Sequence, residues 1–183
     1  MERHVCPWWI GWLLASPVRR LAQDPARILA PWAREGMTVL EPGPGMGFFT
    51  LELARRVGPR GRVVAVDVQP QMLAGLRRRA ARAGLAPRVE ARLARDTSLG
   101  VDDLAGRVDL VLAFAMVHEL PDAEAFFREA RRALAPGGRI LLAEPSGHVG
   151  AGAFQETLAA AGRAGLRAEK GPEIWRSRTA LLG

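Results

Sequence analysis

The chain has 183 residues, of which 49% are hydrophobic and 25% charged, and its formal net charge is +7. This length suits one domain with a proper core, and the composition excludes a disordered or low-complexity chain. Lys170 is the only lysine, and the arginines are spread over most predicted helices. Dispersed cations favour solvated helix faces, so we expect no specific nucleic-acid partner. The single cysteine, Cys6, excludes an internal disulfide and is typical of a cytoplasmic protein.

The amino end is apolar from residue 5 to residue 15 and contains Trp8, Trp9 and Trp12. This stretch is too short to span a bilayer, and Pro7 and the preceding acid make it a poor signal peptide. Tryptophans also suit an interfacial helix at a membrane surface, which stays open as the less favoured alternative. We expect the segment to fold back as a lid over a ligand cleft, without membrane contact.

Strands and helices alternate through the rest of the chain. A short helix begins at the capping residue Asp24, which a first-turn proline follows. The expected strands are 39–41, 62–67, 89–94, 108–115, 139–143, 168–174 and 178–182, and the expected helices are 48–57, 70–83, 122–134 and 150–164. Such alternation predicts a parallel sheet with helices on both faces.

Three glycines at alternate positions, Gly43, Gly45 and Gly47, follow the first strand, and the acid Glu41 stands just before them. Glycines at a strand-to-helix turn permit positive φ and let a ligand approach bare main chain. The dinucleotide fingerprint G-x-G-x-x-G spaces its glycines differently, and Phe48 occupies its third glycine position here. A second landmark is Asp67, which ends the next strand about twenty residues on, where doubly wound nucleotide folds place the ribose-binding carboxylate.

Together these residues resemble the E/D-x-G-x-G-x-G loop and ribose site of class I S-adenosylmethionine-dependent methyltransferases. Residues 131–142, which include Leu-Ala-Pro-Gly-Gly-Arg-Ile, are similar to the turn before the fifth strand in that family. The small-molecule group containing ubiquinone/menaquinone and arsenite methyltransferases is the most similar. The resemblance implies an α/β, Rossmann-like, doubly wound sheet of seven strands, mostly parallel with an antiparallel C-terminal hairpin. It also suggests a single domain over 1–183, with a short helical cap over 1–35 and a cofactor-binding core over 36–183.

The resemblance further assigns S-adenosylmethionine as the cofactor. Its methionine part would lie on the glycine loop and Glu41, and its ribose on Asp67. The remaining residues that it implies for cofactor binding are Val68 and Met72 beside the adenine, Asp96 as acceptor for the adenine amino group, and Ala113 on the fourth strand.

The ends of the fourth and fifth strands carry the residues expected to act on the substrate. His118 and Glu119 follow the fourth strand, and Glu144 and His148 follow the fifth. Strand ends of open α/β sheets line the ligand crevice, so we expect His118, Glu119 and His148 to be catalytic. The segment lacks the N/D-P-P-Y/F signature of methyltransferases that act on nucleobase or glutamine nitrogens.

His4 and Cys6 precede the tryptophans and would join the substrate side if the lid closes. With His118 and His148 they could orient a thiol or bind a soft metalloid, although their spacing matches no established metal site. We therefore expect no metal, and a small-molecule acceptor such as a thiol, a metalloid or another soft nucleophile. RNA or protein methylation, and a non-catalytic cofactor-binding module, remain as alternatives. The sequence leaves the oligomeric state open.

Overall fold

The computed structural model describes residues 23–95 and 98–183 of the chain. Several residues predicted from the sequence lie outside these ranges: His4, Cys6, Trp8, Trp9, Trp12 and Asp96. The lid over the first fifteen residues and the adenine contact of Asp96 therefore stay predictions.

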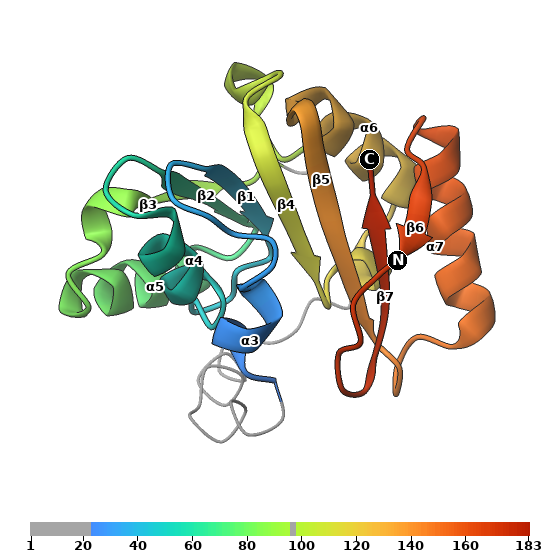
Figure 1. Ribbon diagram of the computed structural model, residues 1–183, viewed down its shortest axis with the longest axis horizontal. Helices are drawn as coiled ribbons and strands as arrows, with labels where there is room; N and C mark the ends of the chain where they lie inside the picture. Colours follow the sequence, from blue (N-terminus) through green and yellow to red (C-terminus); the bar gives the residue numbers. More distant parts are fainter. Residues whose placement is uncertain (1–22, 96–97) are drawn as a thin grey trace. The chain divides into compact units, whose positions relative to one another are not determined.

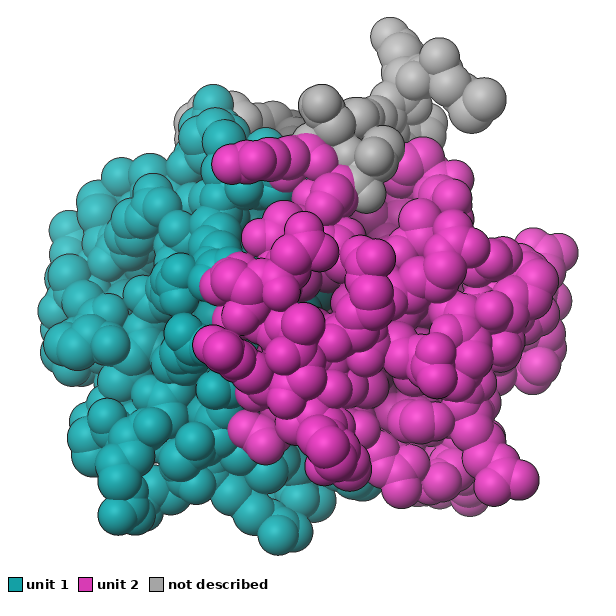
Figure 2. Space-filling model, turned by 90° about the horizontal axis from the view of Figure 1, so that it is seen from above, with its two compact units in different colours: residues 1–94 teal, residues 95–183 magenta. Residues whose placement is uncertain are grey.

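The chain divides into two compact units, residues 1–94 and residues 95–183, which Figure 2 colours separately. Unit 1 has three strands and unit 2 has four, which makes seven strands among the described residues. The predicted seven-stranded, mostly parallel fold with antiparallel C-terminal strands is confirmed. This division does not test whether residues 1–183 form a single domain or whether residues 1–35 form a helical cap. Both stay predictions.

Unit 1 is built on three parallel strands in the order β3-β2-β1, namely β1 Thr38–Pro42, β2 Arg62–Asp67 and β3 Val89–Leu93. Its helices are α3 Pro25–Leu29, α4 Thr50–Val57 and α5 Pro70–Arg82, with the short 3-10 turn η1 Ala86–Arg88 before β3. The predicted cap of the first helix is present, because Asp24 Oδ1 accepts a hydrogen bond from the Ala26 amide at 2.9 Å. Helix α4 packs on β1 and β2, and α5 packs on β2 and β3.

Unit 2 has four strands in the order β4-β5-β7-β6. Their bounds are β4 Val108–Phe114, β5 Leu134–Pro145, β6 Ala168–Lys170 and β7 Ser177–Leu182. The helices are α6 Ala123–Ala133 and α7 Ala151–Arg163, with the 3-10 turns η2 Asp102–Leu104 and η3 Val117–Glu119. Strand β4 is parallel to β5, whereas β7 is antiparallel to both β5 and β6.

Two strands differ from their predicted bounds by more than one residue at an end. Strand β5 begins at Leu134 rather than Arg139, so the Pro-Gly-Gly turn lies within it, and its register with β4 shifts between Val108 and Leu110. A Cβ atom on Gly138 would lie 2.6 Å from the Val108 carbonyl oxygen, so only glycine permits this close approach. Strand β6 ends at Lys170 instead of 174, because the following residues form a loop.

The core consists of aliphatic side chains on the strands and on the inward faces of the helices. The central strands read as nearly continuous apolar runs, as expected for strands covered on both faces. Among the described residues, Phe127 on α6 is the largest fully buried side chain. In the part of the chain that the structure describes, no helix is both long enough and apolar enough to cross a membrane.

Candidate active site

The glycine loop of unit 1 begins at the carboxyl end of β1 and leads into α4. Gly43, Gly45 and Gly47 have φ angles of 66°, 54° and 85°, so all three adopt the left-handed region that favours glycine. The Gly43 amide donates to the Val66 carbonyl at 2.9 Å, which ties the loop to β2. The main-chain conformation predicted from the glycine spacing is thus present.

The loop leaves open space at one glycine and is closely packed at another. A Cβ atom on Gly45 would meet no atom within 4 Å, whereas one on Gly47 would lie 2.5 Å from Leu76 Cδ1. On the α5 side, Arg79 donates a hydrogen bond to the Met46 carbonyl. The loop therefore packs against α5 at Gly47 and Met46, and its backbone is accessible at Gly45. A ligand that binds to main-chain groups requires such an arrangement.

Glu41, near the end of β1 just before this loop, is a buried acid. The residue is 3% exposed, and its Oε2 has no hydrogen-bond partner among the residues the structure describes. Burial raises the pKa of Glu41 to about 7. The nearby Thr50 hydroxyl opposes this rise without a well-formed hydrogen bond, and the charge of Asp67 adds to it.

A buried carboxylate oxygen without a hydrogen-bond partner destabilises the folded protein unless a ligand pairs with it. The ammonium of a bound amino acid moiety would supply both hydrogen bonds and the opposite charge. The residues of unit 1 therefore fit S-adenosylmethionine: a bare glycine loop, an orphaned acid and the amino end of α4.

The residues predicted to hold the ribose and adenine lie at the end of β2 and the start of α5. Asp67 is 8% exposed, and its Oδ1 accepts a hydrogen bond from the Gln69 amide at 2.9 Å. Val68 is exposed, whereas Met72 is buried. Ala113 is buried within β4 of unit 2. Their roles in cofactor binding stay predictions.

The site in unit 2 centres on a histidine–carboxylate pair. His118 lies in η3 just after β4, and Glu144 lies near the end of the neighbouring strand β5. His118 Nδ1 forms a short hydrogen bond with Glu144 Oε2, and Glu144 Oε1 accepts a hydrogen bond from the Val117 amide at 2.8 Å. The Glu144 side chain is fully buried. Both of its oxygens have hydrogen-bond partners, and both partners lie in the η3 turn, as buried carboxylate oxygens require.

The pair fixes both the tautomer and the basicity of His118. The hydrogen bond to Glu144 raises the pKa of His118, burial partly opposes this, and the charges of Glu144 and Glu119 raise it further. A carboxylate at Nδ1 keeps the proton there in the neutral ring, so Nε2 carries the lone pair. Glu119 Oε1 lies 4.0 Å from Nε2, too far for a hydrogen bond, and Nε2 makes none within the described ranges.

The structure describes all three residues predicted to be catalytic. His118 and Glu119 are near one another, and His148 is exposed in the loop after β5, where its side chain makes no hydrogen bond with the described residues. Their catalytic roles stay predictions. Glu144, which was not among the predicted catalytic residues, contacts His118. Its position at the end of the strand adjacent to β4 was the available signal in the sequence. Over residues 23–95 and 98–183, no group of three or more His, Cys, Asp and Glu side chains could hold a metal ion.

Comparison with known proteins identifies the family. A family model described as a methyltransferase domain matches residues 33–174, so the chain belongs to the methyltransferase domain family. The predicted membership of a methyltransferase family is thereby confirmed.

Individual relatives agree with this assignment. The chain is 36% identical over 109 residues to an arsenite methyltransferase of Halobacterium salinarum, a match that covers 60% of this chain and 27% of that protein. It is 35% identical over 118 residues to the ubiquinone/menaquinone biosynthesis C-methyltransferase UbiE of Idiomarina loihiensis, covering 64% of this chain and 46% of that protein. The chain thus spans less than half the length of either relative.

The fold also matches solved structures. A structure described as a SAM dependent methyltransferase from Aquifex aeolicus superposes with a TM-score of 0.85, covering 97% of this chain and 98% of that one at 24% identity. At this level of identity the match concerns the fold alone.

Proposed function

We propose that this protein transfers a methyl group from S-adenosylmethionine to a small-molecule acceptor whose attacking atom loses a proton, such as a hydroxyl. The observation that carries the proposal is the His118–Glu144 pair, with Nδ1 held by a buried carboxylate. Glu41 and the loop at Gly45 would hold the cofactor, and His118 would act on the acceptor.

The cofactor, when bound, supplies an electrophilic methyl group on a sulfonium. A neutral hydroxyl is a weak nucleophile, so removing its proton as the new bond forms is the help that the protein can give. His118 Nε2 is suited to take that proton, because the resulting imidazolium is stabilised by Glu144 through Nδ1. The proton would leave to solvent afterwards, since the His118 side chain is 28% exposed.

The soft acceptor predicted from the sequence rests on different residues. A thiol ionises close to neutral pH by itself and needs a base less than a hydroxyl does. His4 and Cys6, on which the thiol or metalloid hypothesis depends, lie outside the described residues. A protein that holds a histidine base on a buried carboxylate therefore favours the hydroxyl acceptor.

Methyl transfer from radiolabelled S-adenosylmethionine tests the proposal. The acceptors are catechol as a hydroxyl probe, 2-mercaptoethanol as a thiol and arsenite as a metalloid. We expect transfer to catechol that falls about 10²- to 10⁴-fold in His118→Gln, with unchanged affinity for S-adenosylhomocysteine. His148→Gln is the matched comparison: unchanged turnover would show that the base is His118 alone, whereas a similar fall would support the catalytic role predicted for His148.

The pH profile gives a second readout. Because the pKa of His118 is raised above 6.5, turnover of the hydroxyl acceptor should rise with pH through that higher value. Methylation of arsenite or the thiol by the wild-type protein, without transfer to catechol, would favour the soft-acceptor prediction. Methylation of RNA or protein, or binding of cofactor without any transfer, would support the remaining alternatives.

A further inference from the structure

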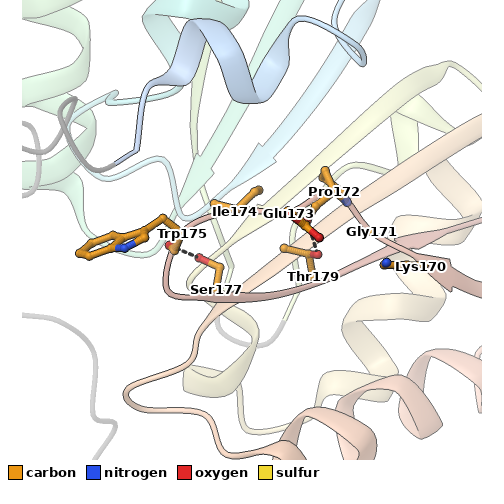
Figure 3. A pocket seen from close by; sticks show the side chains of 8 residues that line it. All are labelled: Lys170, Gly171, Pro172, Glu173, Ile174, Trp175, Ser177 and Thr179. Atoms are coloured by element: carbon orange, nitrogen blue, oxygen red, sulfur yellow. Dashed lines mark hydrogen bonds between the residues drawn. The ribbon is translucent and has the colours of Figure 1, made fainter.

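The loop between β6 and β7 borders a cavity of about 550 Å³, and Figure 3 shows the side chains that line it. Ile174 and Pro172 contribute apolar surface, while Ser177 and Thr179 contribute hydroxyls. The Ser177 hydroxyl donates to the Trp175 carbonyl at 3.4 Å, and the Thr179 hydroxyl donates to the Pro172 carbonyl at 2.6 Å. Both oxygens keep lone pairs for a ligand, and the volume falls in the range of small-molecule pockets.

Trp175 is the most exposed large hydrophobic side chain among the described residues, with 61% of its surface accessible. In Figure 3 its ring points away from the other labelled side chains. The guanidinium carbon of Arg176 lies 5.3 Å from the ring centroid, a cation–π contact that occupies part of the indole. A large indole left this open on a loop is typical of a binding surface.

The backbone of this loop is strained. Arg176 has a φ of 52°, and Ala115, just after β4, has a φ of 55°; they are the two non-glycine residues with positive φ in the described part of the chain. The Arg176 carbonyl accepts a hydrogen bond from the Ser146 amide at 2.9 Å, and the Ala115 amide donates to the Ala143 carbonyl at 2.7 Å. Strained residues of this kind gather at functional sites. Ala115 follows β4, and Arg176 precedes β7 beside the end of β5.

The strand register brings the loop close to that pair. Glu144 on β5 faces Arg178 on β7, and Trp175 precedes Arg178 by three residues. With about 5 Å between paired Cα atoms and at most about 3.8 Å per residue, the Trp175 Cα lies within roughly 17 Å of the Glu144 Cα. Since His118 contacts Glu144, the loop and the histidine–carboxylate pair lie at the same end of these strands.

We propose that Trp175 and the cavity beside it bind the methyl acceptor through a planar aromatic ring, placing a hydroxyl of that ring toward His118. The inference rests on the proposed function and specifies its substrate class. A planar ring stacks on an indole, whereas a saturated ring has no such face to offer. A cationic acceptor is disfavoured, because the Arg176 guanidinium already occupies the indole and would repel it.

A binding measurement that needs no methyl transfer tests this proposal. The full chain, saturated with S-adenosylhomocysteine, is titrated by ligand-detected NMR with catechol and with cyclohexane-1,2-diol, its saturated counterpart. We expect catechol to bind about tenfold more tightly, and Trp175→Ala to weaken catechol by about the same factor, in keeping with the energy of an aromatic pair. Trp175→Phe should recover most of the affinity.

Leu93→Ala, which removes another exposed apolar side chain, is the matched control and should leave catechol binding unchanged. Circular dichroism establishes that each variant is folded. Equal binding of both probes, or unchanged catechol affinity in Trp175→Ala, overturns the proposal. Trp175-dependent binding without any methyl transfer supports the aromatic site and refutes the proposed function, whereas transfer to catechol with unchanged KM in Trp175→Ala does the reverse.

Discussion

The buried acid Glu41 should make the stability of this protein fall as pH rises. Its pKa is raised from 4.5 to about 7, so the folded protein binds a proton that the unfolded chain has already released between these values. The contribution to stability is therefore fully present below pH 4.5 and is lost as pH rises to about 7. At 1.36 kcal/mol per pKa unit, the full span corresponds to about 3 kcal/mol, of which roughly 2.5 kcal/mol falls between pH 5 and pH 8.

Glu41→Gln isolates this effect, because the amide has the same shape and does not titrate. Urea unfolding followed by circular dichroism gives the free energy of unfolding of both proteins at pH 5, 6, 7 and 8. The stability of the variant relative to wild type should rise by about 2.5 kcal/mol across this range. Any fixed cost of burying the amide cancels in the comparison across pH, as does the titration of His118, which both proteins share.

The exposed acid Glu35 provides the control, and Glu35→Gln should show a nearly constant difference from wild type. A constant difference for Glu41→Gln as well would show that burial does not hold the proton on this acid, and the argument from its unpartnered oxygen would lose its basis. The same variant should bind S-adenosylhomocysteine at least about tenfold more weakly, because it loses a charged partner for the ligand ammonium.

Two further predictions concern the glycine loop and Glu144. Gly45→Ala should cost only about 1–2 kcal/mol of stability from left-handed strain but weaken S-adenosylhomocysteine binding in calorimetry, because its Cβ enters the open side of the loop. Gly47→Ala adds a clash with Leu76 and should cost roughly 2–5 kcal/mol in chemical unfolding; equal stability losses for the two variants would refute this account. Glu144→Gln offers an N–H to Nδ1 of His118 and so moves the ring proton to Nε2, which should lower turnover about 10²- to 10⁴-fold with unchanged cofactor affinity. It should also move the rising limb of the pH profile to lower pH, and a profile that does not move would contradict the pairing.

The sequence predicted the fold well where local signals were strong. Strand β2 has the predicted bounds, Arg62 to Asp67, because a β-branched run ends in an acid before a loop. The glycine spacing predicted the left-handed loop, which depends on the backbone of a few consecutive residues. Strand β6 was predicted too long, since an apolar residue such as Ile174 can be buried by a loop as well as by a sheet.

Contacts between distant residues were harder to predict. His118 and Glu144 are 26 positions apart, and their pairing depends on the register of β4 against β5. The same holds for Glu129 on α6, which accepts hydrogen bonds from the Leu99 and Gly100 amides. From the sequence alone His148 was predicted to be catalytic, and Glu144 was noted only as an acid after the same strand. The contact between Glu144 and His118 became visible only in the structure.

The antiparallel insertion of β7 between β5 and β6 has a consequence for how such a protein changes during evolution. Because β7 runs back along β5, its preceding loop returns to the edge where β4 and β5 end. Residues 171–176 can lengthen, shorten or change side chains there without altering a buried strand. With the acceptor bound as proposed, mutation of this one surface hairpin would change acceptor preference while the glycine loop and the histidine–carboxylate pair stay in place.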